Sequence, residues 1–517
     1  MKLTRRVKFF YLVLLLIILY LSAAVYSIIT NTFYLSRFID ENGISYADKN
    51  LNLKEYTKLI LNLNKANSSK KKDITEINII INPLNIYKIE LERQSALKID
   101  LLGNPKYHKA KIIINGQYEH TAKIRLKGEL KDNWKNLKRS SLKIVFEKKN
   151  KFFPQEIGVQ KPSSRQFPYD FIHNKLKKEF GLIDNRRGLV RVKLNSIEWG
   201  IMDFEERFGS TYFENSKLIE SPILKLGDHE GIFFRKLFFK ETFIGNPNFD
   251  WNFYNENNNK KFRKIISYFM QNYLNNNEKI INLSGFLNEF ILASIFNDFH
   301  PLNYSNIRFY LNKFTGKLDP ITSDASYTFE PEPRYINNLN YIMIFQKIVS
   351  SADFKNAYEK EIKKIDISKL CEVFKTEIIK LKEIFFLEKE KECILKINEN
   401  VLNYFKKIET MNNVSLRQFN IEKIDKRFSK FKHINFIHFL NGDVKIFNLV
   451  NLPIYLHKVV YKENGITKEH IIDRIISPNN TLKNPFFINT QIKGSLDDKI
   501  SLRYKIHDKS FEITNHI

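Results

Sequence analysis

Apolar and polar residues alternate from about residue 74 onward, and this alternation predicts short β-strands. Turn signals separate the apolar runs, and the pair Asn115-Gly116 is typical of a two-residue hairpin turn. Further hairpins are expected at 189–206 and at 306–324. The first predicted strands are 77–84, 111–120, 122–128 and 141–146. The pattern therefore indicates a β-rich segment that extends to about residue 220.

Helical spacing of apolar residues takes over in several later blocks. Residues 169–180 are expected to form a helix that ends at Gly181, since glycine commonly follows the last helical turn. Two more helices are expected at about 259–275 and 284–298. Residues 352–411 contain no Gly or Pro and many Glu/Lys pairs, which predicts two or three long helices.

The C-terminal part returns to alternation, with turn signals such as Asn441-Gly442 and Asn464-Gly465. We therefore expect a small all-β module there. The predicted organisation is an N-terminal signal anchor (1–30), a stalk or linker (31–73), a core that is β-rich to about 220 and helical after it (74–330), a helical extension (331–432) and the β module (433–517).

The N-terminus carries the apolar run Phe9–Ile29, whose 21 uncharged residues are about as many as a membrane span needs. The positive charges that precede it, Lys2 to Lys8, favour a cytoplasmic N-terminus. This predicts a single-pass protein of the cell membrane with the bulk of the chain extracytoplasmic. A cleaved signal peptide ending near Ser22–Ala24, and hence a secreted protein, is the alternative.

The amino-acid composition and the net charge narrow the classes of protein and partner. The 517 residues are 43% apolar and 27% charged, an ordinary globular mixture that disfavours disorder, collagen-like repeats and a multi-span membrane protein. The net charge is +27, which suggests an anionic neighbour, although an AT-rich coding sequence would raise Lys over Arg without any binding role. Because either reading of the N-terminus exports the chain, nucleic acid is not expected as a partner.

Two cysteines, Cys371 and Cys393, fall in one helix-like stretch. A continuous helix would place them roughly 33 Å apart, which predicts that they form no disulfide. Two cysteines also exclude a zinc cluster of the CxxC type.

No GxGxxG, Walker, HExxH or GxSxG motif occurs in the chain. The candidate catalytic and metal-binding residues therefore come mainly from residues 297–324. There Asp298 follows a predicted helix, Asn306 comes eight residues later, and Asp324 follows a hairpin. Phosphoryl transfer uses such a set, with one acid orienting the acceptor hydroxyl while an Asn and a second acid hold a metal. Caps and turns use the same residue types.

Five motifs in order resemble the CotH kinase (spore-coat protein H) family. The strand and glycine IRLKG (124–128) and the Lys-bearing strand KRSSLKIVF (138–146) come first. The hairpin LVRVKLNSIEWGIMDFEE (189–206) and the short strand Ile223-Leu224-Lys225 follow. The last is NDFHPLNYSNIRFYLNKFTGKLDPITSD (297–324), which resembles the active-site stretch of the family.

The resemblance implies an α+β fold, namely an atypical protein-kinase-like two-lobed fold that binds ATP between a β-rich and a helical lobe. With the features above, the expected fold adds an N-terminal transmembrane helix and a small C-terminal β module. By position, the resemblance gives Asp298 as the catalytic acid and Asn306 and Asp324 as ligands of Mg²⁺ or Mn²⁺. The cofactor-binding candidates are Lys143, Glu206 and Lys225.

Several alternatives stay open at these positions. Glu205 lies beside Glu206 and would point to the opposite face of a strand. His300 and Asn303 compete with Asn306 for the metal role, and Gly128 stands alone where the family has a glycine-rich loop.

The sequence thus predicts a membrane-anchored extracytoplasmic kinase that transfers a phosphoryl group from ATP to Ser/Thr or sugar hydroxyls. Its expected partner is an exported protein or an envelope polysaccharide. The alternative is a non-catalytic CotH-like protein that organises an envelope, a coat or a polysaccharide.

Overall fold

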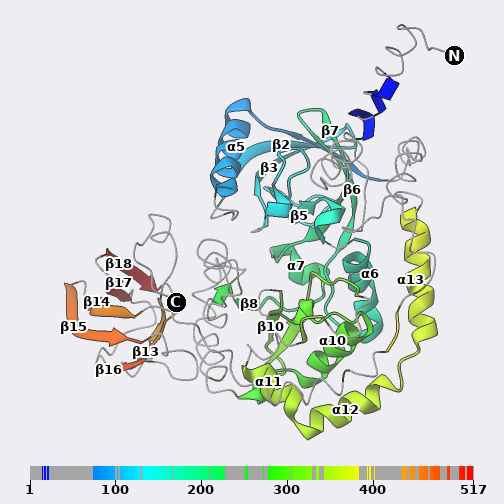
Figure 1. Cartoon of the computed structure of the whole chain (residues 1–517). Coiled ribbons are helices and arrows are strands. Elements are labelled where there is room, and N and C mark those ends of the chain that lie inside the picture. Colours follow the sequence, from blue (N-terminus) through cyan, green and yellow to red (C-terminus); the bar gives the residue numbers. More distant parts are fainter. Residues whose placement is uncertain are drawn as a thin grey trace, which may run out of the picture.

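Seven strands close into a barrel in the computed structural model (Figure 1). The structure describes most of residues 74–226, 277–382 and 434–515, with gaps, and short pieces at 14–22, 251–253, 272 and 393–401. In the barrel the strand order is β1-β2-β3-β4-β5-β7-β6, and the ring closes because β1 pairs with β6 in parallel. The strands are β1 (Glu76–Ile80), β2 (His108–Ile114), β3 (Tyr118–Leu126), β4 (Leu142–Phe146), β5 (Glu156–Gln160), β6 (Arg187–Leu194) and β7 (Ile197–Glu206).

Alternation along the strands fills the barrel with apolar side chains. In β4, for example, Leu142, Ile144 and Phe146 are buried inside, whereas Lys143 and Val145 face outward. Helix α5 (Pro83–Leu97) follows β1 and adds Ile89 and Ala96 to the same core. The predicted turn at Asn115-Gly116 is confirmed, since both residues have the positive φ that this hairpin turn requires.

A second core lies in the helical part below the barrel in Figure 1. The predicted helix at 169–180 is confirmed as α6 and a following 3₁₀ turn, and it ends at Gly181 in the left-handed conformation. The helices here are α6 (Tyr169–Leu176), α7 (Ser210–Asn215), α10 (Leu283–Ile295), α11 (Met343–Ser350), α12 (Ala352–Ile362) and α13 (Ile367–Lys382). A small sheet of order β11-β10-β8-β9 packs among them, with β8 (Ile223–Leu226), β9 (Trp251–Phe253), β10 (Arg308–Asn312) and β11 (Lys317–Ile321).

The C-terminal strands form two further sheets, of order β12-β13-β16 and β15-β14-β17-β18, on the left of Figure 1. Their bounds are β12 (Ile434–His438), β13 (Asp443–Asn448), β14 (Ile454–Glu463), β15 (Ile466–Ile476), β16 (Phe486–Asn489), β17 (Ile500–Ile506) and β18 (Lys509–Asn515).

The predicted fold class is wrong. The β-rich segment is a closed barrel and not the small lobe of a kinase-like two-lobed fold, because the β1–β6 pairing leaves no open edge. The predicted transmembrane helix is contradicted as well: within the part of the chain that the structure describes, no helix is long and apolar enough to cross a membrane. Most of Phe9–Ile29, like the predicted helix at 259–275, lies outside the described residues.

The expectation about the cysteines is also wrong. Cys371 and Cys393 form a disulfide, with their α-carbons 5.4 Å apart. The two residues therefore cannot lie on one continuous helix, and α13 ends at Lys382, between them.

Candidate functional site

A charged cluster lies where the barrel meets α6 and the segment 322–326. Asp203 and Glu205 on β7 point outward, because the alternating residues Met202 and Phe204 point into the barrel core. Asp203 and Glu205 are at most 3% exposed, so both carboxylates are buried. Buried charges of this kind need partners, and the cluster supplies them.

Lys127, just after β3, is the first of these partners. Its ammonium donates to Gln160 Oε1 and lies 3.5 Å from Glu205 Oε2. Burial lowers the pKa of Lys127 to about 7, although the Glu205 carboxylate opposes that shift. Lys127 is therefore a lysine that changes its charge near neutral pH.

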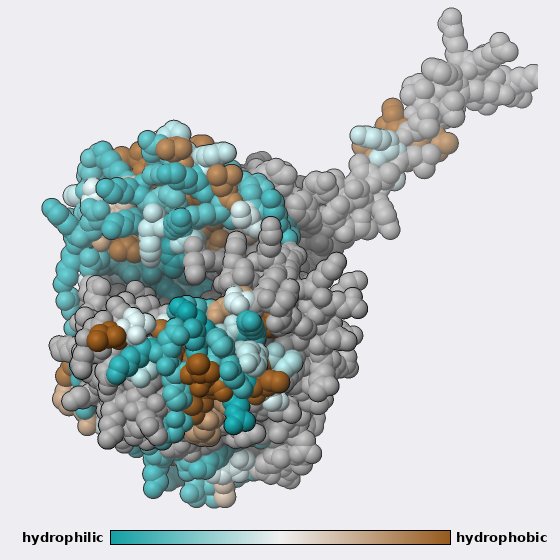
Figure 2. All heavy atoms as spheres, turned by 90° about the vertical axis from the view of Figure 1, so that its left-hand side faces the viewer, coloured by the Kyte–Doolittle hydropathy of each residue, from teal (hydrophilic) through white to brown (hydrophobic). Residues whose placement is uncertain are grey.

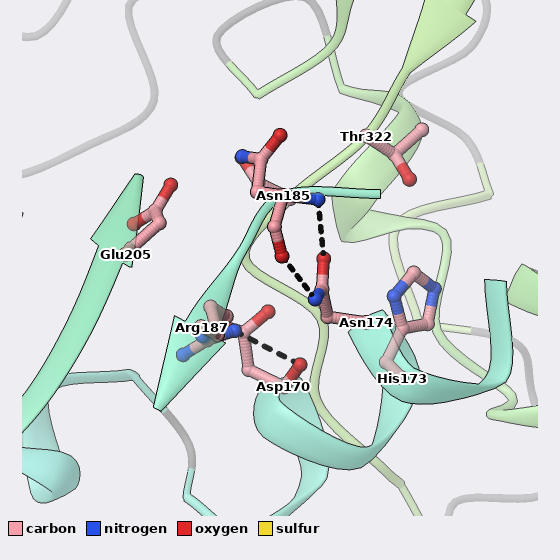
Figure 3. Close-up of a pocket in the computed structure, with 8 residues that line it drawn as sticks. Asp170, His173, Asn174, Asn185, Arg187, Glu205 and Thr322 are labelled. Carbon is pink, nitrogen blue, oxygen red and sulfur yellow. Dashed lines mark hydrogen bonds and ion pairs between the residues drawn. The ribbon is translucent and has the colours of Figure 1, made fainter. Parts of the chain in front are cut away.

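Arg187 on β6 holds the barrel to helix α6. Its guanidinium bonds Asp170 Oδ2 at 2.8 Å and also contacts the carboxylate of Asp203. Figure 3 shows Arg187 and Asp170 facing each other from the strand and the helix. Asp170 in turn accepts the backbone N–H of Ala325 at 2.9 Å, so this carboxylate also positions the 322–326 segment.

His300 brings together the three residues predicted at 297–324. Its backbone N–H donates to Asp298 Oδ1 at 3.0 Å, and its Nε2 lies 3.4 Å from Asp324 Oδ2. The Asn306 amide donates to the His300 carbonyl at 3.0 Å. Arg165 then joins this group to the barrel, because it bonds Asp324 Oδ1 at 3.1 Å and Glu205 Oε2 at 2.9 Å.

The backbone is unusual at Asp324 and at the residue before Asp298. Asn297, directly before Asp298, has φ of 52°, and Asp324 has φ of 68°. Residues other than glycine rarely adopt this left-handed conformation, and such positions cluster at functional sites.

The two acids also differ in their electrostatics. Burial raises the pKa of Asp298, which accepts hydrogen bonds from the Ser326 N–H and hydroxyl. Burial would also raise the pKa of Asp324, but Arg165 and His300 outweigh it and hold this pKa below its usual range. Asp324 is consequently ionised, and burial counteracts ionisation of Asp298.

Two of the three predicted cofactor-binding residues, Lys143 and Glu206, do not join this cluster. Lys143 lies on the outer face of β4 and bonds Glu156 Oε1 at 2.6 Å. Glu206 points away from Glu205 and accepts a hydrogen bond from the Asn215 amide at 2.6 Å. Lys225 belongs to β8, but its side chain lies outside the described part of the structure.

The side chains of this group determine whether the predicted metal ion fits. Within the described ranges, no three His, Cys, Asp or Glu side chains gather closely enough to hold a metal ion. Mg²⁺, however, takes one or two carboxylates together with phosphate oxygens and water, and Asp324 and Asn306 offer oxygen ligands of that class. The residues fit such an ion in chemistry, provided that Arg165 and His300 leave the Asp324 carboxylate.

A small polar cavity adjoins the cluster, with room for about one water molecule (Figure 3). Two atoms at its wall, His173 Nε2 and Asn185 Oδ1, have no hydrogen-bond partner among the described residues. Burial and the nearby Lys177 and Arg187 cations lower the pKa of His173 well below its usual value, so the imidazole is neutral. The lining residues are Asp170, His173, Asn174, Asn185, Arg187, Glu205, Thr322 and Ser323.

Sequence reasoning missed Lys127, Arg165, Arg187 and Asp203 and placed Glu205 second to Glu206. The sequence did contain a signal for Asp203 and Glu205. These acids alternate with Met202 and Phe204, and alternation on a strand places the two acids on one face. No local signal marked Arg165, which lies in a short 3₁₀ turn.

The comparisons with known proteins add no family. No protein-family model matches the chain, and a search among curated proteins found no match.

Proposed function

We propose that this chain is a CotH-like phosphotransferase that moves a phosphoryl group from ATP to a Ser/Thr or sugar hydroxyl. The observation that carries the proposal is the convergence of Asp298, Asn306 and Asp324 on His300. Two cations, Arg165 and Lys127, adjoin the same group through Glu205. Acids that orient a hydroxyl, next to cations that neutralise phosphate, are what phosphoryl transfer requires of a protein.

The proposed roles follow from these positions. Asp298 orients the acceptor hydroxyl, while Lys127 and Arg165 contact phosphate oxygens. Asp324 and Asn306 would hold Mg²⁺ or Mn²⁺, which, when bound, neutralises charge on the phosphates. Arg165 now bonds Asp324, so ATP binding has to draw this guanidinium from the carboxylate to the phosphates.

The proposed substrate is an exported protein or an envelope polysaccharide. The Cys371–Cys393 disulfide supports this part of the proposal, because disulfides persist mainly in oxidising compartments. The proposal places the protein outside the cytoplasm.

One observation favours a second candidate, a non-catalytic protein that organises an envelope polymer. Both oxygens of Asp324 already face a nitrogen of a basic side chain, with Arg165 at Oδ1 and His300 at Oδ2. In that case the cluster serves only to fix the barrel to the helical part.

Nucleotide binding by the full chain distinguishes the two candidates. We expect ATP with Mn²⁺ to raise the melting temperature of the wild type, and Lys127→Ala to weaken ATP binding about tenfold or more. Lys143→Ala is the matched control, because Lys143 bonds Glu156 and does not join the cluster. Asp298→Asn should still bind ATP but fail to transfer labelled phosphate. Absence of metal-dependent ATP binding by the wild type would favour the non-catalytic candidate.

A further inference from the structure

Four cations form a surface on the outside of the barrel, which we call the basic face. They are Lys109 on β2, Lys123 and Arg125 on β3, and Lys143 on β4. The strand register places Lys109 directly opposite Lys123, and Arg125 directly opposite Lys143. Two pairs of like charges therefore lie side by side across three neighbouring strands.

Like charges opposite each other destabilise a sheet, so this arrangement costs free energy unless an anion compensates it. Lys143 has such a partner, because Glu156 Oε1 lies 2.6 Å from its ammonium. Lys109 and Lys123 are exposed, and neither has an ion-pair partner among the residues that the structure describes. The acidic side chains that the structure describes therefore neutralise only part of the positive charge of the basic face.

An aromatic ring completes the basic face. Tyr107 is 42% exposed, and its ring centre lies 5.2 Å from the Arg125 guanidinium carbon and 5.8 Å from the Lys143 ammonium. An exposed aromatic ring beside cations offers a flat surface for the C–H groups of a sugar ring. The cations bind the acidic substituents of that sugar.

We propose that the basic face binds an acidic polysaccharide, in which carboxylates recur along a chain of sugar rings. Neighbouring strands are about 4.8 Å apart and alternate residues about 6.8 Å apart, so the four cations lie within the reach of one or two sugar units. The disulfide favours a glycan over nucleic acid, because it implies an oxidising compartment. In Figure 2 the surface over the barrel, in the upper half of the view, is mostly hydrophilic with scattered apolar residues, which favours a glycan over a lipid surface. The inference does not depend on the proposed phosphotransferase activity.

Binding of the full chain to polygalacturonate tests the proposal. We expect affinity that falls with added salt, no binding to neutral dextran, and at least about tenfold weaker binding for Lys109→Glu/Lys123→Glu. Tyr107→Ala should also weaken binding, without any change of net charge. The matched control is Lys360→Glu/Lys363→Glu, which makes the same charge change at α12 and should bind within about twofold of the wild type.

Three results would overturn the proposal. The first is equal weakening by the α12 control, which would make the binding a matter of net charge alone. The second is wild-type affinity in Lys109→Glu/Lys123→Glu that folds normally by circular dichroism. The third is binding to single-stranded DNA, or to vesicles of equal phosphatidylglycerol and phosphatidylcholine, that is as tight as binding to polygalacturonate.

Discussion

The Lys127 side chain lies across the α-carbon of Gly158. A Cβ at residue 158 would stand 2.7 Å from both Cε and Nζ of Lys127, closer than real side chains approach. Glycine at this position of β5 therefore leaves the space that the Lys127 side chain needs to reach Gln160 and Glu205.

We expect Gly158→Ala to fold and to displace only the flexible end of Lys127. The pKa of Lys127, lowered to about 7 by burial, should then rise toward the usual lysine value as its ammonium reaches water. Nuclear magnetic resonance of ¹³C-methylated lysines would measure this pKa. The Lys143 signal serves as the internal control, and an unchanged Lys127 pKa would contradict the prediction.

Arg187→Met should destabilise the protein strongly, because it leaves Asp170 and Asp203 buried without their shared cation. We expect a loss of about 3–5 kcal/mol in the free energy of unfolding, measured by denaturant titration. Lys193→Met on the same strand is the control. Its partner Glu76 is partly exposed, so the loss there should stay below about 1 kcal/mol. Similar losses for both variants would contradict the assigned role of Arg187.

Glu206 should make stability depend on pH. Burial raises the pKa of Glu206 to about 7, above the 4.5 of an unperturbed glutamate. Between these values the folded state binds more protons, so the contribution of Glu206 to stability is present below pH 4.5 and is lost as pH rises through 7.

Glu206→Gln should therefore be more stable than the wild type at pH 8, by about 1–2 kcal/mol, and should lose this advantage near pH 4. The glutamine can still accept the hydrogen bond from Asn215. Urea unfolding at several pH values would measure the difference, with the exposed Glu214→Gln as the control. A wild type that becomes more stable relative to Glu206→Gln between pH 5 and pH 7 would show that the sign is wrong.

Reduction of the Cys371–Cys393 disulfide, which spans 22 positions, should lower the free energy of unfolding by about 3 kcal/mol. The double variant Cys371→Ser/Cys393→Ser should start from that lower value and should not respond to a reductant. Denaturant titration with and without dithiothreitol makes the measurement. Detection of two free thiols in the unreduced, denatured protein would contradict the pairing.

Local structure was predictable wherever one or two residues determine it. Asn115-Gly116 requires a hairpin turn and Gly181 ends a helix, and both were predicted correctly. Closure of the barrel was not, because β1 pairs with β6 across more than a hundred residues and no local pattern encodes that contact. The disulfide was not predictable for a related reason: a helix-like stretch without Gly or Pro suggests that Cys371 and Cys393 lie far apart, although a chain can reverse without either residue.

For the candidate site, the sequence predicted the residues that share one segment. Asp298, Asn306 and Asp324 lie within 27 positions of one another and do converge on His300. Lys127 and Arg165 come from other segments and join the group through Glu205 on β7, and no local pattern encodes these contacts. The resemblance indicates Lys143 on its Lys-bearing strand, and the sequence does not show that Lys127, just after the preceding strand, is the lysine that is covered.

The closure of the barrel through β1 has a practical consequence for shortened forms of the protein. A fragment that begins after residue 82 would lose β1 and with it the partner of both β2 and β6. Two strand edges with unpaired N–H and C=O groups would then be open to pairing with other chains. We expect such a fragment to aggregate, whereas one that begins at residue 74 keeps the ring intact and should stay in solution.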